Sequence, residues 1–377
     1  MLDTQQPSAM TTTMTTTTVA LRWLLSAYRA MLPVKVLVTH MKEQLTDESD
    51  GGHWSSLEVQ ALVLDYVLRD PVCDDFPPHK TYVYRFLKSY VSELHDELVA
   101  ELMEFVLHAR VGDVVLSPED LHHVSYTIPA SGQRSENDLV PASPGALVVT
   151  CRVASVINEV GLKIWQAGWY LAEYVITHPE VFEDKTVLEL GAGVGFTGLV
   201  LAQVARPKRV VLSDYAARVM QNLRYNTEVN ASRFQCPVDV VTLDWESWDP
   251  STADAELHPD VLLAGDCVYD VAAFPHLVRV LQVFLRLPVA TAAEHRALSG
   301  ARASAARDAE TPQPERKAIF AATIRNQKTF QAFLDHLALF AIAYEDVTAA
   351  ALARMGAQMF PYQDREQIRL CALTRAS

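Results

Sequence analysis

The sequence has little cysteine and little positive charge, and each shortage excludes a class of protein. Its 5 cysteines are scattered without a CxxC pair, so neither a disulfide framework nor a zinc site is expected, and a reducing compartment is indicated. The 12 histidines include no HExxH motif, and we expect no metal. The net charge of −14 argues against direct nucleic-acid binding, which needs clustered lysine and arginine.

A long uninterrupted apolar run is also missing. The nearest one, residues 19–38, contains Arg22, Arg29 and Lys35, and Pro33 breaks its helical pattern. Charges near the centre of a bilayer are costly, so an amphipathic helix packed on protein is expected, and no membrane association. Together with the unpaired cysteines, this favours a cytoplasmic protein.

The patterning predicts a helical part followed by an α/β part. Residues 1–18 form a threonine-rich leader expected to be disordered. Residues 19–120 carry apolar residues at helical spacing and predict a helical domain. Residues 121–377 alternate strand and helix patterns, which predicts an α/β fold with a parallel, Rossmann-like sheet and a ligand crevice at the carboxyl ends of its strands. Within them, residues 289–316 lack large apolar residues and are expected to be a disordered insertion.

The densest glycines follow a strand in the stretch VLELGAGVGFTGLVLA, and two registers compete there. Gly193, Gly195 and Gly198 satisfy GxGxxG, the fingerprint of dinucleotide-binding folds. On this interpretation the chain is an NAD-dependent oxidoreductase. That class also requires a Lys, Tyr or His partner at the hydride site, for which the sequence offers no supporting motif.

The other register begins with Glu189 at the end of the strand and continues through Gly191, Ala192 and Gly193. A carboxylate beside a helix N-terminus would repel a pyrophosphate. It suits a cationic sulfonium cofactor, whose amino-acid end can lie against the glycine backbone. We therefore favour S-adenosylmethionine over a dinucleotide.

Polar residues also end the next two strands. Asp214 closes VVLSD, where a carboxylate can accept hydrogen bonds from both ribose hydroxyls, or can instead cap the following helix. Asp244 and Trp245 close the third strand. There Asp244 is a candidate contact for the adenine amino group, and Trp245 either covers the adenine ring or belongs to the core.

The fourth strand ends in Gly265 and Asp266, followed by Tyr269. With ELGAG and LDW, this Asp-x-x-Tyr motif resembles the seven-β-strand (class I) methyltransferases, and among them the protein-lysine branch. The segments GLKIWQAGWYLAEY, IRN and MFPY extend the likeness to the eukaryotic elongation factor 2 lysine methyltransferases, from about Ser56 to the end of the chain.

The resemblance implies a seven-stranded class I methyltransferase sheet with an N-terminal helical domain, S-adenosylmethionine as cofactor, and a monomer that methylates a lysine of elongation factor 2. It implies cofactor contacts at Trp165, Gly191 to Gly193, Asp214, Trp245 and Gly265. One departure lies just before Gly161, where the family usually carries small residues and threonine and this chain has Asn158, Glu159 and Val160.

We expect Asp266 to bind the incoming ammonium group and orient the amine, and Tyr269 to form one wall of the amine channel. The simpler alternatives are that Asp266 caps the next helix and that Tyr269 packs beneath it. Two alternatives for the whole chain also stay open: the same chemistry on another acceptor, or a catalytically silent methyltransferase-like binding module.

Overall fold

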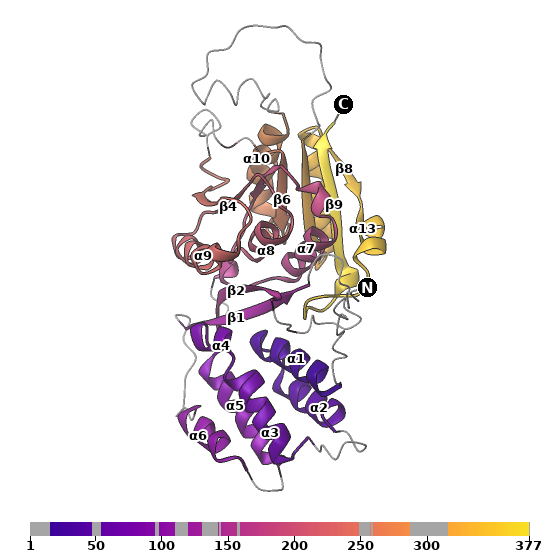
Figure 1. Cartoon of the computed structure of the whole chain (residues 1–377). Helices are drawn as coiled ribbons and strands as arrows, with labels where there is room; N and C mark the ends of the chain where they lie inside the picture. Colours follow the sequence, from indigo (N-terminus) through magenta and orange to yellow (C-terminus); the bar gives the residue numbers. More distant parts are fainter. Residues whose placement is uncertain are drawn as a thin grey trace, which may run out of the picture. The chain divides into compact units, whose positions relative to one another are not determined.

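The computed structural model describes residues 16–46, 54–94, 98–109, 120–129, 142, 145–156, 159–248, 257, 259–286 and 316–376. Most of the predicted leader, the predicted insertion up to residue 315 and most of the loop expected at residues 131–145 lie outside the described residues. The chain divides into two compact units (Figure 1). The first comprises Met1–Val114 with Pro141–Pro144, and the second Val115–Val140 with Gly145–Ser377.

The described part of the first unit is helical, as the spacing of its apolar residues predicts. Its elements are α1 (Thr16–Arg29), α2 (Val34–Gln44), α3 (Leu57–Val63), the π-helix η1 (Leu64–Leu68), α4 (Pro71–Asp75), α5 (Lys80–Ser92) and α6 (Ala100–Ala109). Pro33 separates α1 from α2, because a proline inside a helix removes a hydrogen bond and clashes with the preceding turn. Phe86 and Tyr90 of α5 are fully buried, and Arg29 forms a buried ion pair with Asp70.

The second unit contains a seven-stranded sheet in the order β5-β4-β3-β6-β7-β9-β8. Its strands are β3 (Thr186–Glu189), β4 (Arg209–Asp214), β5 (Val238–Thr242), β6 (Val261–Gly265), β7 (Lys317–Thr323), β8 (Ile342–Asp346) and β9 (Ile368–Arg375). Strand β9 runs antiparallel to both β7 and β8, and the other neighbouring pairs are parallel. The predicted α/β fold with a mostly parallel, Rossmann-like sheet is confirmed.

Helices cover both faces of this sheet (Figure 1). Leu188 and Leu262 belong to one apolar cluster with residues of α10 (Phe274–Arg286) and α12 (Gln327–Leu339). Because side chains alternate along a strand, Glu189 faces the opposite side. There it meets α8 (Phe196–Val204), which packs beside α7 (Gln166–Thr177).

Strands β1 (Leu121–Ile128) and β2 (Leu147–Ala154) form a separate antiparallel pair. Buried asparagine side chains of α9 (Ala217–Asn230) form hydrogen bonds with β2. The Asn226 Oδ1 accepts a hydrogen bond from the Arg152 N–H at 2.8 Å, and the Asn230 Oδ1 accepts one from the Thr150 N–H at 3.0 Å. These bonds satisfy backbone groups of β2 that would otherwise be unpaired at a sheet edge.

One helix differs from the sequence prediction. Helix α13 (Thr348–Met355) follows β8, where only a connection was expected. Its sequence TAAALARM is rich in good helix formers, and Ala351 and Met355 are buried. In the described part of the chain, no helix is long and apolar enough to cross a membrane.

Candidate functional site

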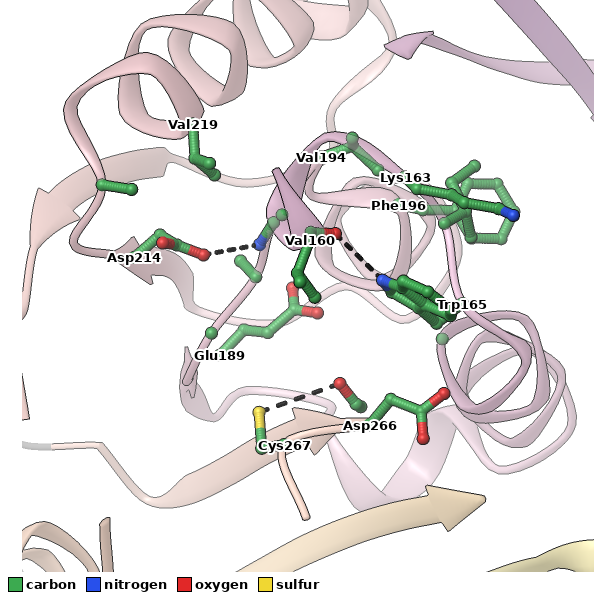
Figure 2. Close-up of a pocket in the computed structure, with 18 of the residues that line it drawn as sticks. Val160, Lys163, Trp165, Glu189, Val194, Phe196, Asp214, Val219, Asp266 and Cys267 are labelled. Carbon is green, nitrogen blue, oxygen red and sulfur yellow. Dashed lines mark hydrogen bonds between the residues drawn. The ribbon is translucent and has the colours of Figure 1, made fainter. Parts of the chain in front are cut away.

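A cavity of about 400 Å³ opens at the carboxyl ends of β3, β4 and β6, where the order of the sheet reverses (Figure 2). Ligands bind at such switch points in open α/β sheets. The fold brings together ten of the eleven site residues predicted from the sequence. Those that line the cavity are Trp165, Glu189, Gly191, Ala192, Gly193, Asp214, Trp245, Gly265, Asp266 and Tyr269.

The turn after β3 exposes its backbone to the cavity. Gly193 has φ +57°, a left-handed conformation that favours glycine. A Cβ placed on Gly193 would lie 3.0 Å from the Gly161 carbonyl oxygen. Both the conformation and the close approach of the segment around Gly161 therefore require glycine at this position.

The Glu189 side chain hydrogen-bonds to the first turn of α8. Its Oε2 accepts a hydrogen bond from the Gly198 N–H at 2.9 Å, and the Thr197 side chain donates another. Burial raises the pKa of Glu189 to about 8, with a smaller contribution from the nearby charge of Asp214. An N–H at the start of this helix, which a pyrophosphate would need, is therefore already engaged by a carboxyl group.

Gly198, the third glycine of the dinucleotide fingerprint, has a packing role that is common to both registers. A Cβ on Gly198 would lie 2.2 Å from Leu212 Cδ2 and 2.6 Å from Glu189 Oε2. The third glycine of the fingerprint thus allows α8 to pack closely on β4 and on the Glu189 side chain.

Asp214 joins the end of β4 to the glycine turn. Its Oδ2 accepts a hydrogen bond from the Gly193 N–H at 3.0 Å, and its Oδ1 accepts one from the Tyr215 N–H at 2.7 Å (Figure 2). The N-cap position of α9 belongs to Ala216, although the Ala216 N–H also hydrogen-bonds to Asp214. Burial raises the pKa of the Asp214 carboxyl, and its backbone donors oppose that rise.

The two candidates after β5 behave differently. Trp245 lines the cavity, and its Cζ2 lies 3.3 Å from the Cβ position of Gly191. It also packs against the main apolar cluster, and its contact with the adenine ring stays a prediction. The Asp244 carboxylate accepts hydrogen bonds within its own turn, from the Glu246 N–H at 3.1 Å and the Ser247 hydroxyl at 2.8 Å. The adenine contact of Asp244 stays a prediction.

Asp266 follows β6 in a left-handed conformation, with φ +56°, and its carboxylate is fully engaged. The Thr323 N–H and hydroxyl donate to it at 3.1 and 3.0 Å, and the Ala167 N–H donates at 3.4 Å. The Arg325 guanidinium donates two further bonds, at 3.2 and 3.0 Å. Asp266 therefore ties the end of β6 to β7 and to the first turn of α7.

Trp165 and Tyr269 are aromatic residues that line the cavity. The Trp165 indole N–H donates to the Val160 carbonyl at 2.9 Å (Figure 2). The Arg325 guanidinium lies 5.3 Å from the Trp165 ring centroid. The Tyr269 side chain is 56% exposed, which leaves its ring available to a ligand at the opening. Burial of part of this residue raises the pKa of its hydroxyl, so Tyr269 is protonated at neutral pH.

The cavity is acidic. Within the described chain, its lining includes four acidic residues, Glu159, Glu189, Asp214 and Asp266, and the single basic residue Lys163, whose ammonium group lies 5.3 Å from the Trp165 ring centroid. Because the pKa of Glu189 is raised to about 8, its carboxyl group adds little negative charge at neutral pH. Such a lining favours a cationic ligand over a diphosphate. Among the described residues, no group of three or more metal-binding side chains is present.

Sequence reasoning did not single out Arg325 and Glu159 as site residues, although the structure places Arg325 against Asp266 and Glu159 at the cavity wall. Arg325 follows β7 in the IRN segment that supported the resemblance, but nothing in that segment alone pairs it with Asp266. Glu159 was noted only as a departure from the family pattern. Its Oε2 is buried at the cavity wall, and among the described residues no hydrogen-bond donor reaches it.

Comparison with known proteins agrees with this geometry. Residues 153–299 match a family model described as lysine methyltransferase. The sheet order, the cavity at its switch point and this match define the second unit as a class I methyltransferase domain.

Two relatives extend the likeness to nearly the whole chain. The human protein-lysine N-methyltransferase EEF2KMT is 27% identical over 342 residues, which cover 89% of this chain and 90% of the relative. The protein-lysine N-methyltransferase EFM3 of Chaetomium thermophilum is 23% identical over 351 residues, covering 88% of this chain and 94% of the relative. The resemblance drawn from the sequence is confirmed, and the chain is a protein-lysine N-methyltransferase.

Proposed function

We propose that this enzyme transfers a methyl group from S-adenosylmethionine to a lysine of elongation factor 2. The observation that supports this substrate is the extent of the sequence similarity to the EEF2KMT relatives. The lysine methyltransferase model covers residues 153–299, whereas the likeness to the EEF2KMT relatives covers 89% of the chain and so includes most of the helical unit. A segment outside the methyl-transfer domain that is shared with these relatives supports a shared protein substrate.

The residues around the cavity fit the cofactor. The backbone from Gly191 to Gly193 would receive its amino-acid end, Asp214 its ribose hydroxyls and Trp245 its adenine ring, with Trp165 and Gly265 completing the wall. The cofactor supplies a methyl group on a cationic sulfur. The acidic lining and the engagement of the Gly198 N–H by Glu189 support a sulfonium compound over a dinucleotide.

The reacting lysine must arrive as a neutral amine about 3 Å from the methyl carbon, so positioning supplies much of the rate. A free lysine has a pKa of about 10.4 and is mostly protonated at neutral pH. Desolvation between aromatic walls lowers that pKa, and water can take the released proton. The exposure of Tyr269 and the presence of Trp165 in the cavity lining support such a channel.

The contacts of Asp266 refine its proposed role. A carboxylate that already accepts five hydrogen bonds, two of them from a guanidinium, is held rigidly and partly neutralised. We therefore assign Asp266 the role of a positioning residue, which fixes Arg325 and the start of α7 around the path of the amine. Direct binding of the ammonium group remains the alternative. We place the reaction in the cytoplasm, where elongation factor 2 acts.

The acceptor is tested by mass spectrometry. Elongation factor 2 purified from cells that lack this enzyme is incubated with the enzyme and S-adenosylmethionine, and its peptides are analysed. We expect methyl groups on one lysine, and no change when the Gly193→Arg variant, whose side chain fills the cavity, replaces the enzyme. In a parallel incubation, the lysate of the same cells receives the enzyme and S-adenosylmethionine with a labelled methyl group. Labelling of another protein, with elongation factor 2 unmodified in both incubations, would contradict the substrate assignment but not the methyl-transfer activity.

A further inference from the structure

The carboxylates that line the cavity differ in how well they are satisfied. Glu189, Asp214 and Asp266 each accept at least two hydrogen bonds from the protein. Glu159 is different, because its Oε2 is buried and no donor among the described residues reaches it. A buried polar atom without a partner costs about 1–3 kcal/mol, and more when it is charged. Such an atom at a cavity wall is a free acceptor that a ligand in the cavity can use.

The segment that carries Glu159 lies against the glycine turn. The carbonyl oxygen of Gly161, two residues along the chain, is 3.0 Å from the Cβ position of Gly193, and the Val160 carbonyl accepts the hydrogen bond from the Trp165 indole (Figure 2). Glu159 therefore lies beside the part of the cavity formed by the glycine turn and Trp165. This is the part to which the proposed function assigns the amino-acid end of the cofactor.

We propose that Glu159 binds the α-ammonium group of S-adenosylmethionine. The inference rests on the proposed function, because it requires the cofactor to occupy this cavity. The chemistry is complementary: a carboxylate oxygen without a donor meets a primary ammonium group that carries three N–H donors. The contact is a charge-assisted hydrogen bond, which is among the stronger contacts available in a protein.

The test is calorimetric and needs no methyl acceptor. Wild type and Glu159→Gln are titrated with S-adenosylhomocysteine, which has the α-ammonium group, and with 5′-methylthioadenosine, which lacks the whole amino-acid end. We expect Glu159→Gln to weaken S-adenosylhomocysteine binding by about tenfold or more and to leave methylthioadenosine binding unchanged. Glu228→Gln is the matched control, because Glu228 is exposed on α9, and it should bind both ligands as wild type does.

A second measurement separates ligand binding from a structural role. Glu159→Gln replaces a carboxyl group whose Oε2 is buried without a partner among the described residues, so the melting temperature of the ligand-free variant should equal or exceed that of wild type. A lower melting temperature together with equal losses for both ligands would mean that Glu159 only holds the fold. Unchanged S-adenosylhomocysteine affinity, with a raised KM for the methyl acceptor, would assign Glu159 to the incoming lysine instead. A wild-type protein that binds neither ligand would overturn the proposed function itself.

Discussion

Asp266 shows what a single residue's position in the sequence can and cannot reveal. Its place at the end of an apolar strand predicted that it would reach the cavity, and it does. Its partners Thr323 and Arg325 come from β7 and the residues that follow it, and only the pairing of β6 with β7 brings them within reach. Arg325 could not be identified as a site residue beforehand, because long-range pairing is not encoded in a local motif.

The role of Asp266 leads to a prediction about a pair of variants. If Asp266 acts by holding Arg325, then Asp266→Asn and Arg325→Met should each lower kcat for methylation by about tenfold or more, since small misplacements around a reacting centre are costly. Both should still bind S-adenosylhomocysteine as wild type does. The measurements are steady-state methyl transfer and calorimetry on each variant.

Arg369→Met is the matched control for this pair. Arg369 lies on β9 with its side chain 41% exposed, 3.9 Å from Asp346, and its loss should leave kcat unchanged. Opposite effects of the Asp266 and Arg325 substitutions would support direct ammonium binding by Asp266. In that case Asp266→Asn abolishes turnover, while Arg325→Met preserves or raises it by freeing the carboxylate.

At the scale of the element, the glycine-rich turn and α8 decide between the two registers found in the sequence. The sequence satisfies both the GxGxxG register and the register that begins with Glu189. The structure separates them through Glu189, whose side chain accepts a hydrogen bond from the Gly198 N–H in the first turn of α8. The packing of Gly198 on Leu212 is common to both registers. The sequence placed the turn correctly, but the direction of the Glu189 side chain depends on the alternation of β3 and on its neighbour α8.

Two glycines of this element should therefore respond differently to the same substitution. Gly193→Ala forces a Cβ into a left-handed position beside the Gly161 carbonyl and should weaken S-adenosylhomocysteine binding by about tenfold or more. Gly198→Ala overpacks the interface between α8 and β4 and should lower the free energy of unfolding by about 1–3 kcal/mol. Calorimetry and denaturant unfolding of both variants measure the two effects.

Gly145→Ala controls for backbone strain, because Gly145 has φ +76° and no atom within 4 Å of its Cβ position. It should cost about 1–2 kcal/mol of stability and leave ligand binding unchanged. If Gly193→Ala behaved like this control, the glycine turn would not be the cofactor site.

Element prediction succeeded where periodicity and burial agree. The pattern predicts a strand over residues 261–265, and β6 has these bounds. It also predicts a helix over residues 164–176, and α7 begins at Gln166 and ends at Thr177. Helix α13 was missed because only Ala351 and Met355 of its eight residues are buried, so its apolar pattern is too short to be distinctive. Its position follows from packing on α7 and β9, which local sequence does not specify.

At the scale of the whole molecule, the two units differ in whether they contribute residues to the proposed cofactor site. The cavity and all the cofactor contacts proposed here belong to the second unit. The helical unit carries no chemical motif, but the similarity to protein-lysine methyltransferases extends into it. Composition and periodicity predicted these two parts, while the choice of substrate rests on the extent of the similarity.

The central claim is that the acidic cavity after β3 holds a sulfonium methyl donor rather than a dinucleotide. Its most direct test is calorimetric titration of the full chain with S-adenosylhomocysteine and, separately, with NADH. The account predicts saturable binding of S-adenosylhomocysteine at one site, lost in Gly193→Arg, and no binding of NADH. Saturable NADH binding that Gly193→Arg abolishes, with no binding of S-adenosylhomocysteine, would contradict it.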